Sequence, residues 1–271
     1  MLKVHSTAYL PDTKRIEAYL SPDRDLPLRL DGAGSRFVLC TTPRSGSSLI
    51  ASMLHATGQA GDPLEYLNDQ WIDVQSRLDA ASVMDFNVAR YLGAWETRRT
   101  SPNGLFGIKV HYYQMKRAWR GQDSEAARVL ENFDNRILLT RRDKIAQAVS
   151  LFRAITSQAW TSRDLAPVSV QKPTVRFDPS RIAELMALLI KQEDGWRSFM
   201  KTFELPYTEF CYEDFVANYA GQSMCLLDSL GVRINEHAIP PPQLKKQSQE
   251  RDPMIEQFKL AIGLEPGPIA T

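Results

Sequence analysis

The sequence lacks the features that define several common protein classes. It has only three cysteines in 271 residues, Cys40, Cys211 and Cys225, and none of them forms a closely spaced pair. An odd number cannot pair completely within one chain, so we expect reduced thiols buried in apolar stretches rather than a disulfide framework. The four histidines are equally dispersed, which argues against a histidine-rich metal cage.

Long apolar runs and an excess of charge of either sign are also missing. No segment approaches the roughly 20 apolar residues that cross a bilayer, and the N-terminus lacks the apolar core of a secretory signal. We therefore expect a cytoplasmic protein with no transmembrane segment. Lys and Arg number 33 against 32 Asp and Glu, a net charge of +1, which does not favour a general nucleic-acid binder. A hydrophobic content of 43% is enough for a full core.

Short apolar runs typical of strands alternate along the chain with segments whose apolar residues have helical spacing, and this order predicts an α/β protein. The runs FVLC, LFGIKV and RILLT have the length and composition of central strands in a parallel sheet. We expect strands at 37–40, 105–110, 136–140 and 207–212. We expect helices at 49–58, 71–80, 125–133, 145–152 and 178–203, and a short one from Pro253. The result is a central, mainly parallel sheet flanked by helices, with residues 37–271 as one domain and residues 1–36 as an N-terminal extension.

The loop after the first strand, residues 41–48 (TTPRSGSS), has the composition of an anion cradle. Its small residues let backbone N–H groups point inward, its hydroxyls can donate, Arg44 adds a fixed charge, and the following helix contributes positive potential. The simpler interpretation is a helix start with a redundant serine cap. Gly46 precedes Ser47 rather than a lysine, so the loop is not the Walker A motif of nucleotide kinases.

A second polar junction follows the third strand. Arg141 and Arg142 come directly after RILLT, and Ser150 lies one to two helical turns later. Ligands of open α/β sheets bind at the carboxyl ends of the strands, so these side chains can face the same crevice as the first loop. An arginine there can bind a phosphate through two hydrogen bonds. The alternative interpretation is a solvated basic helix start.

Residues 41–66, TTPRSGSSLIASMLHATGQAGDPLEY, resemble the opening of the Stf0-type (trehalose 2-sulfotransferase-like) sulfotransferases. The resemblance implies a P-loop-like sulfotransferase fold, with sulfuryl transfer from 3′-phosphoadenosine 5′-phosphosulfate (PAPS) to a hydroxyl of a carbohydrate or other small hydroxylated metabolite, and no metal. It also implies that the 5′-phosphosulfate is held by Arg44, Ser45, Gly46, Ser47 and Ser48. The 3′-phosphate would be held by Arg141 with Ser150, while Arg142 matches the spacing of other sulfotransferases.

Two residues compete for the role of general base in such a transfer. Glu65, in GDPLEY, occupies the position that resembles the catalytic glutamate of the Stf0-type enzymes, and Asp62 could bind acceptor hydroxyls. His111 ends the second strand, and Lys109-Val110-His111 looks like the Lys-x-His of cytosolic sulfotransferases. Imidazole has the more suitable intrinsic pKa, whereas a glutamate would need burial to raise its own pKa. We favour Glu65, with Arg44 and Lys109 supplying positive charge to the transferred group.

The resemblance also implies the partners of the chain. We expect a small hydroxyl acceptor, such as a disaccharide or glycolipid, no nucleic acid, and a homodimer. A basic cluster of Lys245, Lys246 and Arg251 could return to the nucleotide, although a solvated basic tail is an equal alternative. Two other functions stay open at this point: a P-loop-type nucleotide kinase, and a non-catalytic nucleotide-binding module.

Overall fold

A computed structural model of the chain describes residues 13–27, 32–78, 86–157, 160, 175–242 and 252–264. Within these residues the chain forms a four-stranded parallel sheet in the order β2-β1-β3-β4. The strands are β1 (Ser35–Thr41), β2 (Leu105–His111), β3 (Asn135–Thr140) and β4 (Thr208–Cys211). The basic cluster expected at Lys245, Lys246 and Arg251 lies outside the described residues.

The strand order brings both predicted junctions to one edge of the sheet. Thr41, at the end of β1, lies opposite His111 on one side and Leu139 on the other. From β1 the chain passes to β2 on one side and then to β3 on the other, so the strand order reverses at β1. In open α/β sheets such a reversal, at the carboxyl ends of the strands, is where ligands bind.

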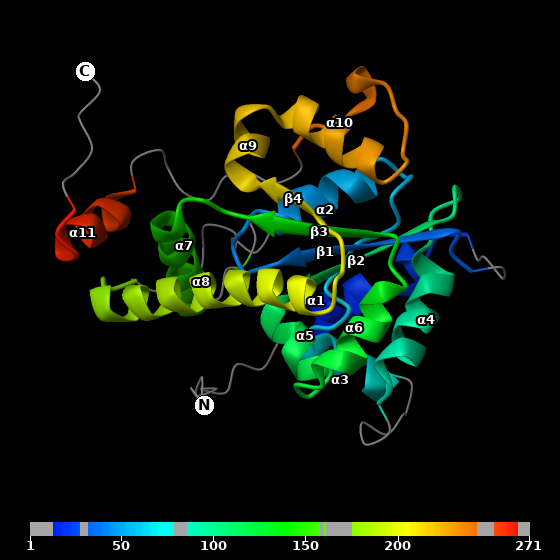
Figure 1. Ribbon diagram of the computed structural model, residues 1–271, viewed down its shortest axis with the longest axis horizontal. Helices are drawn as coiled ribbons and strands as arrows, with labels where there is room; N and C mark the ends of the chain where they lie inside the picture. Colours follow the sequence, from blue (N-terminus) through cyan, green and yellow to red (C-terminus); the bar gives the residue numbers. More distant parts are fainter. Residues whose placement is uncertain are drawn as a thin grey trace.

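Helices cover both faces of the sheet (Figure 1). One face carries α1 (Thr13–Leu20), α3 (Asp69–Leu78), α4 (Val88–Arg99), α5 (Tyr112–Ala118) and α6 (Asp123–Glu131). The other face carries α2 (Ser47–Ala56), α9 (Tyr212–Ala217) and α10 (Tyr219–Ser229). Alternating side chains of β1 explain the two layers, because Val38 and Cys40 pack against the first group while Phe37 and Leu39 pack against the second.

A third group of helices lies beside the carboxyl ends of the strands. It comprises α7 (Lys144–Ser157), α8 (Pro179–Thr202) and α11 (Pro253–Ala261), and Figure 1 shows α11 next to α7. The Asp178 side chain caps α8 by accepting a hydrogen bond from the Arg181 backbone N–H at 3.0 Å. Trp196, near the other end of α8, donates its indole N–H to the Thr41 carbonyl at 2.9 Å and so ties this helix to β1.

The fold class predicted from the sequence is confirmed, and the expected strands and helices form within a few residues of their predicted bounds. The last two residues of the helix expected at 71–80 lie outside the described residues. Sequence reasoning missed five helices: α1, α4, α5, α9 and α10. Among these, α5 and α9 begin directly after β2 and β4, so no loop separates the two patterns.

Part of the predicted N-terminal extension contacts the rest of the chain. In α1, Ile16 and Leu20 are buried in the core beneath the sheet, and they follow the four-residue spacing of a helix face. Two single turns, η1 (Pro22–Arg24) and η3 (Glu236–Ala238), complete the elements of the described residues. In the part of the chain that the structure describes, no helix is long and apolar enough to cross a membrane.

Candidate active site

The loop that connects β1 to α2 has the backbone conformation of an anion cradle. Arg44 and Gly46 both adopt positive φ, at 62° and 83°, which curls the loop around the N-terminus of α2. Only glycine fits at position 46, because a Cβ there would lie 2.2 Å from the Tyr212 ring. The Ser45 hydroxyl is buried without a hydrogen-bond partner, so one donor of the cradle is available to a ligand.

Two side chains from neighbouring helices hold this loop in place. Gln147, fully buried on α7, donates from Nε2 to the Thr42 hydroxyl at 2.9 Å and to the Pro43 carbonyl at 2.8 Å. Trp196 on α8 holds Thr41, at the start of the loop, through its indole N–H. Sequence reasoning missed both residues, because each lies more than 100 positions from the loop that it contacts.

Glu65 lies at the centre of a polar cluster at the ends of β1 and β2. Its Oε1 is 3.0 Å from Lys109 Nζ and 3.4 Å from His111 Nε2, and its Oε2 accepts from Gln114 Nε2 at 2.8 Å. Lys109 also donates to the Ser48 hydroxyl at 3.2 Å. The Lys109 ammonium therefore stands between the anion cradle and the Glu65 carboxylate.

The ionisation of Glu65 differs from the sequence expectation. Burial by itself would raise the pKa of Glu65, but Lys109 and His111 outweigh it through charge and hydrogen bonding, so the pKa lies well below its ordinary value. Glu65 is thus a carboxylate at neutral pH.

His111 has no ring nitrogen that faces open space. Its Nδ1 is 2.7 Å from the Thr41 hydroxyl, its Nε2 faces Glu65, and its side chain is only 8% exposed. With a carboxylate at Nε2, the favoured tautomer carries its proton there and accepts from Thr41 at Nδ1. Glu65, at 21% exposed, is more accessible to an incoming hydroxyl.

The second junction places Arg141 and Arg142 in different environments. Arg141 is 11% exposed and lies 4.8 Å from the centre of the Tyr212 ring, while its Nη1 donates to the Arg44 carbonyl at 3.0 Å. Its Nε is buried without a hydrogen-bond partner and lies 3.8 Å from Glu213 Oε1. Arg142 points away, is 62% exposed and forms an ion pair with Asp214.

Ser150, on α7, and Arg44, in the loop after β1, contact each other. Arg44 Nε donates to the Ser150 hydroxyl at 2.9 Å, and Arg44 Nη1 donates to the Trp160 carbonyl. Because Arg141 binds the Arg44 backbone, the structure brings Arg44, Arg141 and Ser150 together. The two predicted anion subsites therefore share Arg44 as a common neighbour.

Asp62 lies in a buried ion-pair cluster. Its carboxylate is 2% exposed and contacts Arg24, Arg99 and His55 at 2.8, 3.0 and 3.3 Å. Arg24 belongs to the predicted N-terminal extension, so this cluster fastens residues 13–27 to the loop that carries Glu65. These partners occupy the carboxylate that the sequence assigned to acceptor hydroxyls, which favours a structural role for Asp62.

We expect Arg99→Met to lower the free energy of unfolding by about 3 kcal/mol, because removing one partner of a buried ion pair leaves a charge uncompensated. The Arg99 side chain is 0% exposed and also faces Asp25. Urea unfolding measures the change. The control is Arg128→Met, which removes a 72% exposed arginine from a surface pair and should cost below about 1 kcal/mol. Equal losses in the two variants would contradict the structural role of the cluster.

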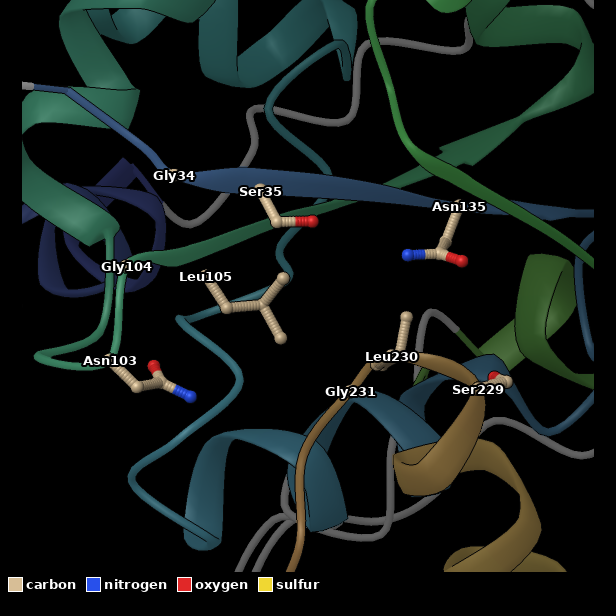
Figure 2. Close-up of a pocket in the computed structure, with 9 residues that line it drawn as sticks. All are labelled: Gly34, Ser35, Asn103, Gly104, Leu105, Asn135, Ser229, Leu230 and Gly231. Atoms are coloured by element: carbon tan, nitrogen blue, oxygen red, sulfur yellow. The ribbon is translucent and has the colours of Figure 1, made fainter.

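A cavity of about 530 Å³ lies at the opposite edge of the sheet (Figure 2). It is lined by residues at the amino ends of the strands, including Ser35, Leu105 and Asn135, and by the turn after α10. None of the predicted site residues lines it. Among the described residues, no group of three or more His, Cys, Asp or Glu side chains could hold a metal ion.

Residues 36–260 match the protein family described as Stf0 sulphotransferase. The trehalose 2-sulfotransferase of Mycolicibacterium smegmatis is 26% identical, and that of Mycobacterium tuberculosis is 28% identical. Each match covers 82% of this chain and 94% of the relative.

The chain also resembles solved structures, among them two sulfotransferase domains. The sulfotransferase domain of the Synechococcus PCC 7002 olefin synthase has a TM-score of 0.48 at 12% identity, covering 91% of this chain and 94% of that chain. The sulfotransferase domain of the curacin biosynthetic pathway has a TM-score of 0.47 at 14% identity, covering 86% and 98%.

Proposed function

The chain belongs to the Stf0 sulphotransferase family and is a sulfotransferase, and from this premise we propose that it transfers a sulfuryl group from PAPS to a hydroxyl of a small carbohydrate. The observation that carries the proposal is the position of Lys109 between Ser48 of the cradle and the Glu65 carboxylate. The names of the mycobacterial relatives support a sugar, and a disaccharide above all, as the acceptor.

The residues at the two junctions fit an adenosine 3′-phosphate 5′-phosphosulfate. The Ser45 hydroxyl is a buried donor without a hydrogen-bond partner, and the buried Arg141 Nε makes no hydrogen bond and lies 3.8 Å from Glu213, so both can donate to a bound anion. Ser45, Gly46, Ser47 and Ser48 would hold the 5′-phosphosulfate at the N-terminus of α2. Arg141 and Ser150 would hold the 3′-phosphate, with Arg44 beside both groups.

Glu65 would accept the proton of the acceptor hydroxyl as the hydroxyl oxygen bonds to sulfur. The bond between sulfur and the bridging oxygen of the phosphosulfate breaks, and adenosine 3′,5′-bisphosphate leaves with that electron pair. Lys109 would stabilise the charge that develops on the transferred group. As Lys109 turns toward this charge, it releases Glu65, whose pKa then rises toward the range in which a carboxylate accepts a proton.

The proposal is tested by incubating the purified chain with PAPS and a panel of disaccharides, monosaccharides and non-sugar alcohols. We expect mass spectrometry to detect a sulfated disaccharide, with turnover unchanged by a chelating agent, because Lys109 and the cradle donors neutralise the transferred group. Parallel reactions with ATP and magnesium test the kinase alternative. Phosphorylated product, or no sulfated product from any acceptor, would overturn the proposed function.

A further inference from the structure

Gln114 is a fully buried residue on α5 that contacts the Glu65 cluster directly. Its Oε1 accepts a hydrogen bond from the His111 backbone N–H at 2.9 Å, and its Nε2 donates to Glu65 Oε2 at 2.8 Å. The second Nε2 hydrogen points toward the Tyr113 hydroxyl, 3.4 Å away. All three principal hydrogen-bonding positions of the amide are therefore used.

The orientation of the Gln114 amide follows from its neighbours. The His111 backbone N–H can only donate, so the amide oxygen must face it and the amide nitrogen must face Glu65. Glu65 is held on both sides: Lys109 and His111 contact Oε1, while Gln114 and Asn68 contact Oε2. These contacts fix the plane of the carboxylate as well as its position.

Helix capping alone does not account for a glutamine here. Gln114 is the third residue of α5, and its bond to the His111 N–H is half of a capping box. A glutamate serves that cap equally well. At this position, however, a glutamate would place a second carboxylate against Glu65, so only the amide both caps the helix and donates to Glu65.

We propose that Gln114 is a positioning residue that holds the Glu65 carboxylate in the orientation in which it receives the acceptor proton. The inference rests on the proposed function, in which Glu65 is the base. It adds a residue that the resemblance to the family did not assign. Gln114 acts through Glu65 and contacts neither donor nor acceptor.

The deciding variant is Gln114→Glu, which keeps the cap on His111 but replaces the donor to Glu65 by an acceptor. Two carboxylates at this distance share one proton, so the pair titrates at a higher apparent pKa than Glu65 alone. The other groups around Glu65 are the same in wild type and in this variant. They are Lys109 and His111 on β2, Asn68, and Tyr113 on α5. We expect the acid limb of the kcat profile to move up by about one pH unit or more, with the KM for PAPS within about 3-fold of wild type.

A second variant, Gln114→Met, removes the donor without adding charge. We expect kcat to fall about 10- to 100-fold through loss of orientation, with binding of adenosine 3′,5′-bisphosphate unchanged. Carbon-13 NMR titration of Glu65 in the free protein gives its pKa independently of turnover, and thermal unfolding checks that each variant is folded. The matched control is Gln222→Glu on α10, which makes the same charge change outside the site and should leave the profile as in wild type.

The outcomes separate this inference from the proposed function. If wild type is active but Gln114→Glu retains the wild-type acid limb and the wild-type Glu65 pKa, the positioning role is overturned while the function stands. If Gln114→Met lowers kcat only in proportion to a loss of folded protein, the role is structural and the inference fails. If wild type transfers no sulfuryl group, the proposed function falls, and the catalytic role of Gln114 falls with it.

Discussion

Glu65→Gln is expected to lower kcat by about 10²- to 10⁴-fold, because general-base catalysis contributes a factor of this size and an amide cannot accept the acceptor proton. The substitution keeps the side-chain shape and one acceptor oxygen for Lys109. Binding of adenosine 3′,5′-bisphosphate should therefore stay within about 3-fold of wild type, since donor binding does not use the base. Single-turnover sulfuryl transfer, together with calorimetric titration of the bisphosphate, measures the two effects.

The comparison variant is His111→Asn, which removes the imidazole but keeps a polar side chain beside Glu65. Both ring nitrogens of His111 are engaged, by Thr41 and Glu65, so we expect a smaller fall in kcat than in Glu65→Gln. A larger fall in kcat in His111→Asn than in Glu65→Gln would identify His111 as the base. Unchanged rates in both variants would reject the scheme.

The pH dependence of wild type follows from the direction of the Glu65 pKa. Since Lys109 and His111 overcome burial and hold this pKa below its ordinary value of 4.5, Glu65 is ionised throughout the neutral range. Activity that depends on the ionised carboxylate is present above the lowered pKa and is lost as the pH falls through it. We expect the acid limb of kcat/KM, which reports the free enzyme, to lie below pH 4.5.

Arg141→Ala is expected to weaken binding of adenosine 3′,5′-bisphosphate by about 30- to 1,000-fold, the usual cost of truncating a buried, hydrogen-bonded charge. Arg141 is 11% exposed, and its Nε lies 3.8 Å from Glu213 without a hydrogen bond, so it can donate to a phosphate. Calorimetric titration of the bisphosphate measures the change.

Arg142→Ala is the matched control, because it removes the same charge from the neighbouring residue. Arg142 is 62% exposed and paired with Asp214, so its loss should change the affinity by less than about 3-fold. The reverse result, in which Arg142→Ala weakens bisphosphate binding and Arg141→Ala does not, would assign the 3′-phosphate to Arg142. Equal, small effects in both variants would mean that neither arginine of the second junction binds the bisphosphate.

Local patterns were enough to predict most of the scaffold. The runs at β1, β2 and β3 are short, apolar and bounded by polar residues, so their strands could be located from composition alone. The helix α4 has apolar residues at Val88, Leu92 and Trp95, a helical spacing that could also have been found. By contrast, α5 and α9 are short and continue directly from strands, so periodicity over six or seven residues could not separate them.

The sequence by itself predicted a strand, a loop of small residues and a helix start around residues 41–48, because these patterns are adjacent in the chain. Only the tertiary structure decided which partners meet there. The contact of Gln114 with Glu65 spans 49 positions, and that of Arg44 with Ser150 spans 106, so both depend on the strand order β2-β1-β3. The lowered Glu65 pKa likewise arises from two basic neighbours on β2, Lys109 and His111, whose effect outweighs burial, and local sequence does not specify these contacts.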